Sequence, residues 1–428
     1  MADIAPFRGI RYDTTRVRAS DVLAPPYDVI DADHWRQLAA RDPHNCVRVI
    51  LPEGDGDAKY SRAAELLDRW LADGVLVRDD QPCLYRYNQV FTSAELGGRE
   101  VVRRGFVAAV RLHRFDERVI LPHERTLKGP KVDRLKLFEA TACHPSQIFT
   151  LYSDPQGAVD EALAAVERTD PVVDGTTDDG TRHLVWRVTD RSMIAAVVEA
   201  LADKPLYIAD GHHRYETMLA YRDRRREAGS DVADFGTLFL ANMDDAGLVV
   251  FPTHRLVHGV PGFSLEKLVA AARDAFDIDT VAGGAADAAK VRAIVTERGA
   301  ARPAFGVVVP GSADLTVMAY RGDLSSASAT ERLDVTILHD VVLEGMLGID
   351  RAAQEAKTNL DYPKDTAVAL ARVAAGDGQC LFVMNPTPVA AVKAVSDEGG
   401  FMPQKSTFFY PKIASGVVFR KLDESIAR

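Results

Sequence analysis

The sequence YIADGHHRYET, residues 207–217, decides the fold of the region around it. The apolar run from Leu206 to Ala209 is typical of a short strand, and after it Met218, Leu219 and Tyr221 recur at helical spacing. The stretch therefore predicts a strand, a turn at its glycine and the N-terminus of a helix.

A helix that begins in this way favours an anion such as phosphate. Its first backbone N–H groups have no acceptors within the helix, and the helix dipole is positive there. Arg214 could hold the anion with two parallel hydrogen bonds, His212 and His213 add donors, and Asp210 could bind a metal or accept a proton. Asp-Gly is also an ordinary turn pair, and Asp210 could be only a helix cap. The uninterrupted His-His-Arg that follows Gly211 favours the functional interpretation.

The composition is that of an ordinary globular protein. The chain has 428 residues, enough for two or three domains, with 47% hydrophobic and 27% charged residues. A formal net charge of -10 argues against a general nucleic-acid-binding protein, since such proteins are usually basic, and leaves a local basic patch open. The four cysteines are far apart, which argues against a zinc cluster or a disulfide framework. No signal peptide or membrane span is recognisable, so we expect a cytoplasmic protein without a membrane partner, and leave a homodimer open.

A second polar stretch, LPHERTLKGPKVDR, occupies residues 121–134. It predicts a loop that leads into a helix through Ala142. The loop and the first helical turn carry six ionisable side chains suited to an acidic ligand: His123, Glu124, Arg125, Lys128, Lys131 and Arg134. A solvated loop before a positively charged helix start is an equally open interpretation.

Three further stretches are weaker candidates. Asp244 and Asp245 could bind Mg²⁺, but turn chemistry alone explains them. His254 and Arg255 lie at the end of a predicted strand. The sequence MPQKSTFFYPK at residues 402–412 could hold a phosphate through its Lys-Ser-Thr, yet it lacks the glycines of a Walker loop. A β-rich edge with two solvated lysines is therefore the default interpretation.

Regular elements are predicted around these stretches. We expect a helix capped by Asp31, a strand from Asn45 to Leu51 and an amphipathic helix from Ala58 to Ala72. Cys83–Thr92 and Glu100–Leu112, separated by two glycines, predict an antiparallel hairpin. Further strands are expected at residues 237–243, 305–309, 315–320 and 380–384, and helical structure at 333–346.

The two principal stretches resemble a known superfamily. With Pro122-His123-Glu124 and Asp210-Gly211-His212-His213-Arg214, the sequence resembles the ParB/sulfiredoxin superfamily and its free L-serine kinases. The whole chain also resembles a widespread bacterial family of unknown function, at Ala24–Val29, the Pro-His-Glu-Arg-Thr loop, Ala209–Glu216 and Pro403–Lys412.

This resemblance implies an α+β or mixed α/β fold with a ParB/sulfiredoxin-like core and additional α/β lobes. The implied division is an N-terminal α/β region at residues 1–115, the catalytic core at 116–260, an α+β insertion lobe at 261–330 and a C-terminal α/β region at 331–428.

The kinase resemblance also implies a reaction. A phosphoryl group would pass from ATP or ADP, with Mg²⁺, to a hydroxyl acceptor, for which free L-serine is the first expectation. Glu124 would be the base, and Asp210 and His213 would also act in catalysis, with Asp210 near the metal. The implied nucleotide-binding residues are Gly211, His212, His213, Arg214, Thr126 and Lys405. Glu124 and Arg214 are expected to line one cleft, roughly 6–12 Å apart.

Two other functions stay open from the sequence alone. One is a nucleotide-binding switch of ParB-like type that acts through a macromolecular partner. The other is a metal-dependent hydrolase built on His212, His213 and the aspartates, although adjacent histidines seldom both reach one metal.

Overall fold

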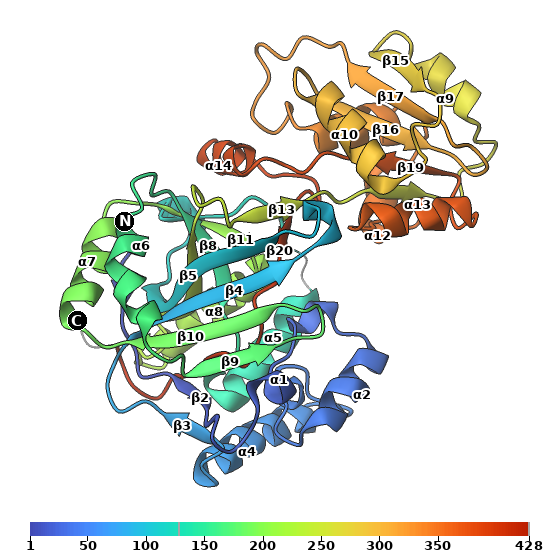
Figure 1. Cartoon of the computed structure of the whole chain (residues 1–428). Coiled ribbons are helices and arrows are strands. Elements are labelled where there is room, and N and C mark those ends of the chain that lie inside the picture. The colour runs from blue at the N-terminus through green and yellow to red at the C-terminus, as the bar shows by residue number, and fades with distance from the viewer. Residues whose placement is uncertain (127–128, 427–428) are drawn as a thin grey trace. The chain divides into compact units, whose positions relative to one another are not determined.

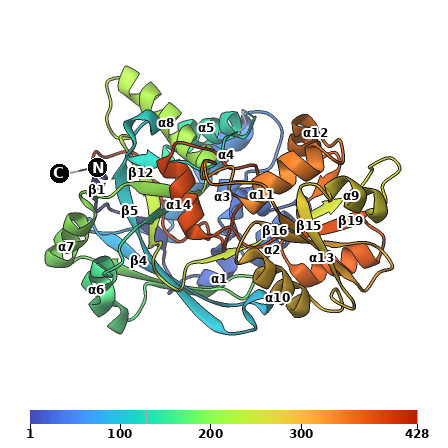
Figure 2. The ribbon, with the colours of Figure 1, turned by 90° about the horizontal axis from the view of Figure 1, so that it is seen from above.

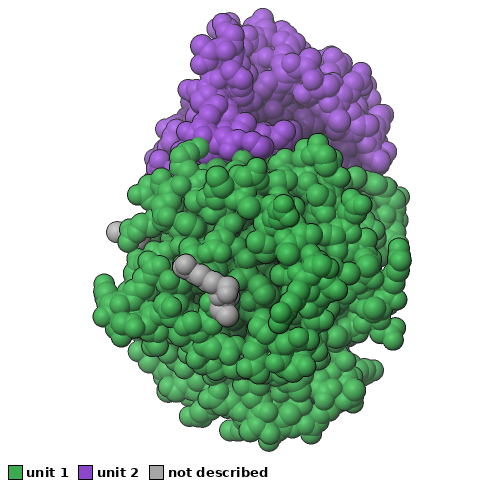
Figure 3. Space-filling model, turned by 90° about the vertical axis from the view of Figure 1, so that its left-hand side faces the viewer, with its two compact units in different colours: residues 1–122, 126–249, 411–428 green, residues 123–125, 250–410 purple. Residues whose placement is uncertain are grey.

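The computed structural model describes residues 1–126 and 129–426 and has a mixed α/β fold, as expected (Figure 1). Its internal contacts divide the chain into two compact units. Unit 1 comprises residues 1–122, 126–249 and 411–428, and unit 2 comprises residues 123–125 and 250–410 (Figure 3).

Unit 1 is built on one large sheet with helices packed on it. Its strands are β1 (Ile4–Ala5), β2 (Ile10–Tyr12), β3 (Leu76–Arg78), β4 (Leu84–Thr92), β5 (Glu100–Arg111), β6 (Ile120–Leu121), β7 (Cys143–His144), β8 (Ile148–Tyr152), β9 (Val173–Thr176), β10 (Arg182–Val188), β11 (Leu206–Asp210), β12 (Phe235–Asn242) and β21 (Arg420–Lys421). Its helices are α1 (Ala19–Val22), α2 (Ala32–Arg41), α3 (Val47–Ile50), α4 (Ala58–Ala72), α5 (Gly129–Thr141), α6 (Ala158–Leu163), α7 (Arg191–Leu201) and α8 (His212–Glu227).

The large sheet has nine strands in the order β6-β11-β8-β12-β5-β4-β10-β9, with β1 paired to β5. The predicted hairpin is confirmed, because β4 and β5 pair antiparallel from Thr92 with Glu100 inward. Its turn needs Gly97 and Gly98, whose φ angles are 68° and 75°. The sheet buries a continuous apolar core on the side that α8 covers.

The predicted strand at residues 45–51 is wrong, because this segment forms the short helix α3. Asn45 accepts a hydrogen bond from the N–H of Val47 through its side chain, which begins the turn locally. Val47, Val49 and Ile50 are all buried in one N-terminal core cluster. A half-buried strand would have alternated between core and solvent, so tertiary burial overrides the β preference of the valines here.

The predicted strand, turn and helix at residues 207–217 are confirmed. β11 is paired on one side with β8 and on the other with β6, so backbone hydrogen bonds hold it from both sides. Gly211 has a φ of 95° and caps the N-terminus of α8. α8 packs beside α5, and the two helices lie side by side in Figure 2. The turn therefore lies between two well-anchored elements.

Unit 2 is a smaller α/β body. The chain enters it at β13 (Val249–Phe251), and its strands are β14 (Arg255–Val257), β15 (Phe276–Val281), β16 (Ala304–Val308), β17 (Leu315–Tyr320), β18 (Leu360–Asp361), β19 (Cys380–Val383) and β20 (Phe408–Tyr410). Its helices are α9 (Leu265–Ala272), α10 (Ala288–Gly299), α11 (Asp334–Ile337), a π-helix (Leu338–Glu344), α12 (Arg351–Ala356), α13 (Thr366–Ala374) and α14 (Val389–Asp397). No helix in the described part of the chain has both the length and the apolar character that a membrane span requires.

Six of these strands form a second sheet, in the order β15-β17-β16-β19-β14-β18, on which α10 and α13 pack. The predicted strands at 305–309, 315–320 and 380–384 are confirmed as β16, β17 and β19. The helix expected at 333–346 begins as α11 but widens into the π-helix. π-helical turns are rare in proteins and are frequent at functional sites.

Each of the two sheets pairs strands that lie on opposite sides of a domain boundary expected from the sequence. β5 precedes residue 115 and β12 follows it, yet the two strands are direct neighbours in the large sheet. Likewise β16 and β19 lie on opposite sides of residue 330 and are paired. The division into regions 1–115, 116–260, 261–330 and 331–428 therefore differs from the two units.

Candidate functional site

The turn between β11 and α8 depends on Gly211. Its φ of 95° belongs to the left-handed region that favours glycine. A Cβ atom placed there would lie 3.0 Å from Nη2 of Arg214. Glycine therefore allows both the backbone conformation and the close approach of the guanidinium to the end of the strand.

Asp210 is held between two cations at this turn. Arg214 donates to Oδ2 of Asp210 at 3.0 Å, and the Lys412 ammonium is ion-paired with Oδ1. Burial by itself would raise the pKa of the Asp210 carboxyl, but Lys412 and then Arg214 outweigh burial and hold that pKa well below its usual range. Asp210 is thus a permanently ionised anchor, and this arrangement does not suit it to accept a proton.

Lys412 reaches this turn because the C-terminal segment is bound to the hairpin β4–β5. Gln89 donates through its amide to the carbonyl of Lys412 at 2.9 Å, and Arg103 donates to the carbonyl of Pro411 at 2.6 Å. The sequence pattern around Lys412 favoured a solvated lysine, and it does not indicate this ion pair. The only available signal was the position of Lys412 at the end of a stretch that resembles a family signature.

Arg103 is a second residue of this region that no sequence pattern indicates. It is 1% exposed, and its guanidinium carbon lies 4.6 Å from the ring centroid of Phe149. Burial lowers the pKa of Arg103 to about 9, while Tyr87 and Asp210 act in the opposite direction, so the guanidinium stays charged at neutral pH. Within the described residues its Nη1 has no hydrogen-bond partner, although a buried donor is normally satisfied.

The cluster at the turn carries excess positive charge. We define this turn cluster as Asp210, its ion-pair partners Arg214 and Lys412, and Arg103, which interacts electrostatically with Asp210. The N-terminus of α8 adds the positive end of a helix dipole. An anion placed at this turn would meet a favourable potential and could accept a hydrogen bond from the unused N–H of Arg103.

Arg214 and Thr126 have structural partners that the sequence did not predict. Besides Asp210, Arg214 donates to Oγ of Ser146 at 3.2 Å and to the carbonyl of Gln147 at 2.7 Å, and it is 5% exposed. Its fork is used inside the protein, so the expected two-bond grip on phosphate does not fit. Thr126 donates its hydroxyl to Glu216 of α8 at 2.6 Å, which fastens the loop to the first turns of that helix.

His212 and His213 occupy the first two positions of α8, where His212 is buried and His213 is half-buried. Tyr27, from the proline-rich N-terminal stretch, also lies near the turn. Burial raises the pKa of Tyr27, and the positive charges of Arg214 and Arg134 oppose that rise. Two stretches that resemble family signatures thus converge in unit 1 with the turn itself.

Asp210 does not fit the expected role of a Mg²⁺ ligand. Both of its carboxylate oxygens are already paired with cations, so a metal ion would have to displace Lys412 or Arg214. Among the residues that the structure describes, no three His, Cys, Asp or Glu side chains are grouped in a way that could hold a metal ion. The candidate aspartates at 244 and 245 serve a turn, where Asp244 accepts from Ser153 and Asp245 from the N–H of Gly247.

The Pro-His-Glu segment is divided between the units, because His123, Glu124 and Arg125 belong to unit 2. The carbonyl of His123 accepts from the N–H of Met402 at 2.8 Å, and Glu124 forms a parallel bridge with the same residue. The guanidinium of Arg125 lies 5.2 Å from the ring centroid of Phe401. Since Arg214 belongs to unit 1, the expected separation of Glu124 and Arg214 stays a prediction.

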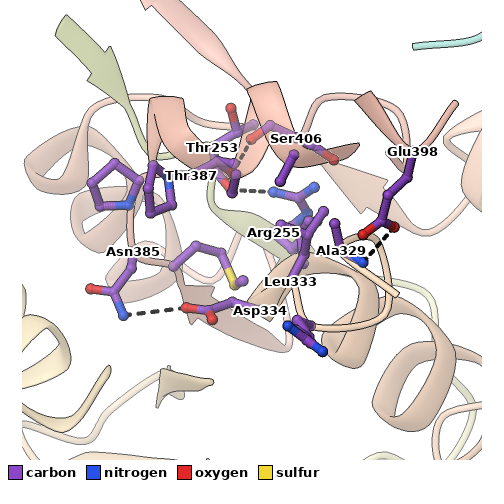
Figure 4. A pocket seen from close by; sticks show the side chains of 16 residues that line it. Thr253, Arg255, Ala329, Leu333, Asp334, Asn385, Thr387, Glu398 and Ser406 are labelled. Carbon is purple, nitrogen blue, oxygen red and sulfur yellow. Dashed lines mark hydrogen bonds between the residues drawn. The ribbon is translucent and has the colours of Figure 1, made fainter. Parts of the chain in front are cut away.

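Two cavities lie in unit 2. The larger, of about 650 Å³, is lined by Arg125, by His339 and Asp340 of the π-helix and by residues 399–404 next to the Glu124 bridge. The smaller, of about 300 Å³, is lined by Arg255, Asp334 and Asn385 among others (Figure 4). The structure places one of the two remaining candidate lysines. Lys405 is exposed, with a φ of 59°, and its backbone carbonyl accepts a hydrogen bond from Arg255 at 3.1 Å. The other candidate, Lys128, lies outside the described residues.

Asp334 is a half-buried carboxyl group without a cationic partner among the described residues. Burial raises its pKa to about 6, and the hydrogen bond from Asn385, 3.4 Å long, only partly offsets this. No ion pair reaches Asp334 within the described part of the chain. A charge that costs stability and has no partner of opposite charge is a frequent mark of a functional position.

The chain belongs to the family described as "Protein of unknown function (DUF1015)", whose sequence profile matches residues 4–336. No protein with a curated description shows significant sequence similarity to it. The resemblance to a family of unknown function that the signature stretches indicated is thus confirmed.

Solved structures with a similar chain course include a free serine kinase in complex with AMP. That structure has a TM-score of 0.34 and 13% identity, and the match covers 71% of this chain and 86% of the other. A conserved hypothetical protein from Pyrococcus furiosus has a TM-score of 0.35 and 14% identity, with 74% and 96% covered. SbnI from Staphylococcus aureus has a TM-score of 0.34 and 12% identity, with 75% and 85% covered. At these scores none of them establishes a shared site.

Substitution of Lys412 tests the ion pairs of Asp210. We expect Lys412→Met to lower the free energy of unfolding by about 2 kcal/mol, slightly below the range for fully buried pairs because Lys412 is partly exposed. Lys136→Met, which removes an exposed lysine paired with Asp57, should change it by less than about 1 kcal/mol. Combination with Asp210→Asn should give a coupling energy of at least about 1 kcal/mol in urea unfolding, and strict additivity would contradict the pair.

Asp334 should make stability fall as pH rises. In the unfolded chain its carboxyl ionises near 3.8 and in the folded protein near 6, so the folded state loses stability between these values. The loss is at most about 3 kcal/mol. Asp334→Asn should therefore be more stable than the wild type at pH 7.5 and equal to it near pH 4, whereas Asp274→Asn, at an exposed position, should behave as the wild type. A less stable Asn variant at pH 7.5 would contradict the burial cost.

Proposed function

We propose that the protein is a phosphotransferase that binds the phosphates of ATP or ADP at the N-terminus of α8. The observation that carries the proposal is the turn cluster, in which Arg214 and Lys412 are ion-paired with one carboxylate and Arg103 adds a third positive charge. Nη1 of Arg103 has no hydrogen-bond partner among the described residues. Nucleotide phosphates carry the negative charge that this cluster lacks. Phosphoryl transfer depends mostly on positioning and charge neutralisation, which such a cluster supplies.

Arg103 and the first backbone N–H groups of α8 are the groups that we assign to the phosphates. Arg214 and Lys412 are assigned a positioning role, because both form ion pairs with Asp210 and so hold the end of β11 in place. When bound, Mg²⁺ would neutralise charge on the phosphates. Since Asp210 does not fit as its ligand, no step is assigned to a metal held by this residue.

Glu124 is the group that we assign as general base, on the resemblance of Pro-His-Glu to the free L-serine kinases. In this reaction the acceptor hydroxyl oxygen forms a bond to the terminal phosphorus of the nucleotide, and the bond from that phosphorus to the bridging oxygen breaks. Glu124 takes the hydroxyl proton, and ADP or AMP leaves with the bridging oxygen. Free L-serine, giving O-phosphoserine, is the first acceptor to examine.

Phosphorus NMR of the pure protein with ATP or ADP, Mg²⁺ and L-serine tests the proposal. A phosphomonoester signal that requires serine supports the kinase. Hydrolysis of nucleotide without an acceptor would instead favour a nucleotide-dependent switch protein. Absence of any turnover or binding of either nucleotide would refute the proposal.

Substitution of Glu124 separates catalysis from binding. Glu124→Gln keeps the shape of the side chain but removes the base, so the transfer rate should fall by about 10²–10⁴. The affinity for ADP in titration calorimetry should stay within a few-fold, because Glu124 is not assigned to the phosphates. A variant that transfers phosphate at the wild-type rate would show that Glu124 is not the base.

Substitution of Arg103 tests the phosphate site. Arg103→Met removes one charge-assisted hydrogen bond, which is worth roughly 1.5–3 kcal/mol, so ADP should bind about 10- to 100-fold more weakly. Arg222→Met is the matched control, because Arg222 is a buried arginine of α8 whose donors go to Leu112 and Asp223. Equal losses of affinity in the two variants would place the phosphates elsewhere.

A further inference from the structure

The smaller cavity of unit 2 is a second site, built from parts that the proposed kinase reaction does not use. It is enclosed by the start of β14, the N-terminus of α11, the segment that follows β19 and one face of α14 (Figure 4). Its volume of about 300 Å³ is at the lower end of the range for small-molecule pockets. Met384, Leu333 and Ala391 give it apolar walls.

Arg255 supplies a buried positive charge to this cavity. It is 1% exposed, and its acceptors among the described residues are all neutral: Nε2 of His339, the carbonyl of Thr253 and the carbonyl of Lys405. A guanidinium has five N–H donors, so two remain for a further acceptor. Burial lowers the pKa of Arg255 to about 10, and the group stays charged at neutral pH.

His339 is held in the tautomer that this arrangement requires. Its Nε2 accepts from Arg255 at 3.1 Å, so Nδ1 must carry the proton that bonds Oε1 of Gln354 at 2.7 Å. Burial lowers the pKa of His339 to about 3, which keeps the ring neutral. The neutral His339 ring therefore does not compensate the positive charge of Arg255, and that charge stays available to a ligand in the cavity.

Asp334 supplies a negative charge to the same cavity. The carboxyl belongs to the first turn of α11, where the helix dipole would lower its pKa, yet burial dominates and raises the pKa to about 6. At neutral pH it is mostly ionised. Asn385 is its side-chain partner, and that amide is shared with the carbonyls of Val295 and Ala304.

Neither of these two charges is paired with an opposite charge in the described part of the chain. Arg255 is fully buried and Asp334 is half-buried. Charges removed from water normally have a partner of opposite charge, because an unpaired one loses hydration free energy. Both charges also line one cavity that has apolar surface between its polar groups. A ligand with one negative and one positive group would satisfy both at once.

We propose that this cavity binds a small zwitterion, with an anionic group on Arg255 and an ammonium group on Asp334. The class includes free amino acids and ω-amino acids, whose few heavy atoms suit the volume. The site is independent of the turn cluster in unit 1 and does not rest on the proposed transfer reaction.

The site is connected to the larger cavity of unit 2. His339 and Gln354, which receive the chain of hydrogen bonds from Arg255, both line that larger cavity. A ligand that draws the guanidinium toward its own anionic group would change the hydrogen bond to His339. The zwitterion therefore acts on the wall of the larger cavity as well as filling the smaller one.

Titration calorimetry of the full-length protein with a series of probes tests the proposal. Glycine, β-alanine, γ-aminobutyrate and δ-aminovalerate vary the separation of the two charges, and butyrate and butylamine each lack one charge. We expect at least one zwitterion to bind about tenfold more tightly than both single-charge compounds. If none of the zwitterions binds at 10 mM, or if butyrate binds as tightly as the best of them, the proposal is overturned.

Three variants localise the binding. Asp334→Asn should abolish the advantage of the zwitterion over the matching carboxylate, while Asp340→Asn, which changes a carboxyl of the larger cavity, should keep it. Ala391→Phe should fill the smaller cavity and abolish binding of every probe. ADP affinity, measured on the same samples, should be unchanged in all three. Loss of zwitterion binding in Asp340→Asn, or its survival in Ala391→Phe, would refute this location, and neither result bears on the nucleotide site.

Discussion

The ion pairs of Asp210 with Arg214 and Lys412 are the interaction on which the candidate site in unit 1 depends. A carboxylate taken out of water needs partners of opposite charge, and these come from the first turn of α8 and from a segment two hundred residues later. Gly211 must be glycine for Arg214 to approach, and Gln89 and Arg103 must bind the C-terminal segment for Lys412 to arrive. One buried charge thus joins β11, α8, the hairpin and the C-terminus.

The parts of the fold that could be predicted are those specified by neighbouring residues. The apolar run before Gly211 predicted β11, the paired glycines predicted the β4–β5 hairpin, and Asp31 predicted the start of α2, where its side chain accepts from the N–H of His34. Each signal lies within a few residues of its effect. The same holds for Asp210 and Arg214, which interact across one helical turn, and the sequence therefore identified the turn correctly.

What could not be predicted depends on contacts between distant segments. Lys412 and Arg103 look like ordinary surface cations in the sequence, because nothing near them indicates that Pro411 will lie against β5. The helix α3 replaced an expected strand because its three apolar residues all face one core. The two units could not be read from local patterns either, since their sheets collect strands from both sides of every suggested boundary.

Arg103 and Arg255 show the same physical situation in two separate bodies. Each is a fully buried arginine whose pKa is lowered by burial and whose acceptors are mainly neutral protein groups. The core around β11 belongs to unit 1 alone, and the core under α10 and α13 belongs to unit 2 alone. A ligand that binds the folded state stabilises it in proportion to the logarithm of its concentration. An anion that pairs with Arg103 therefore offsets the desolvation of a charge within unit 1, and one that pairs with Arg255 offsets the desolvation of a charge within unit 2.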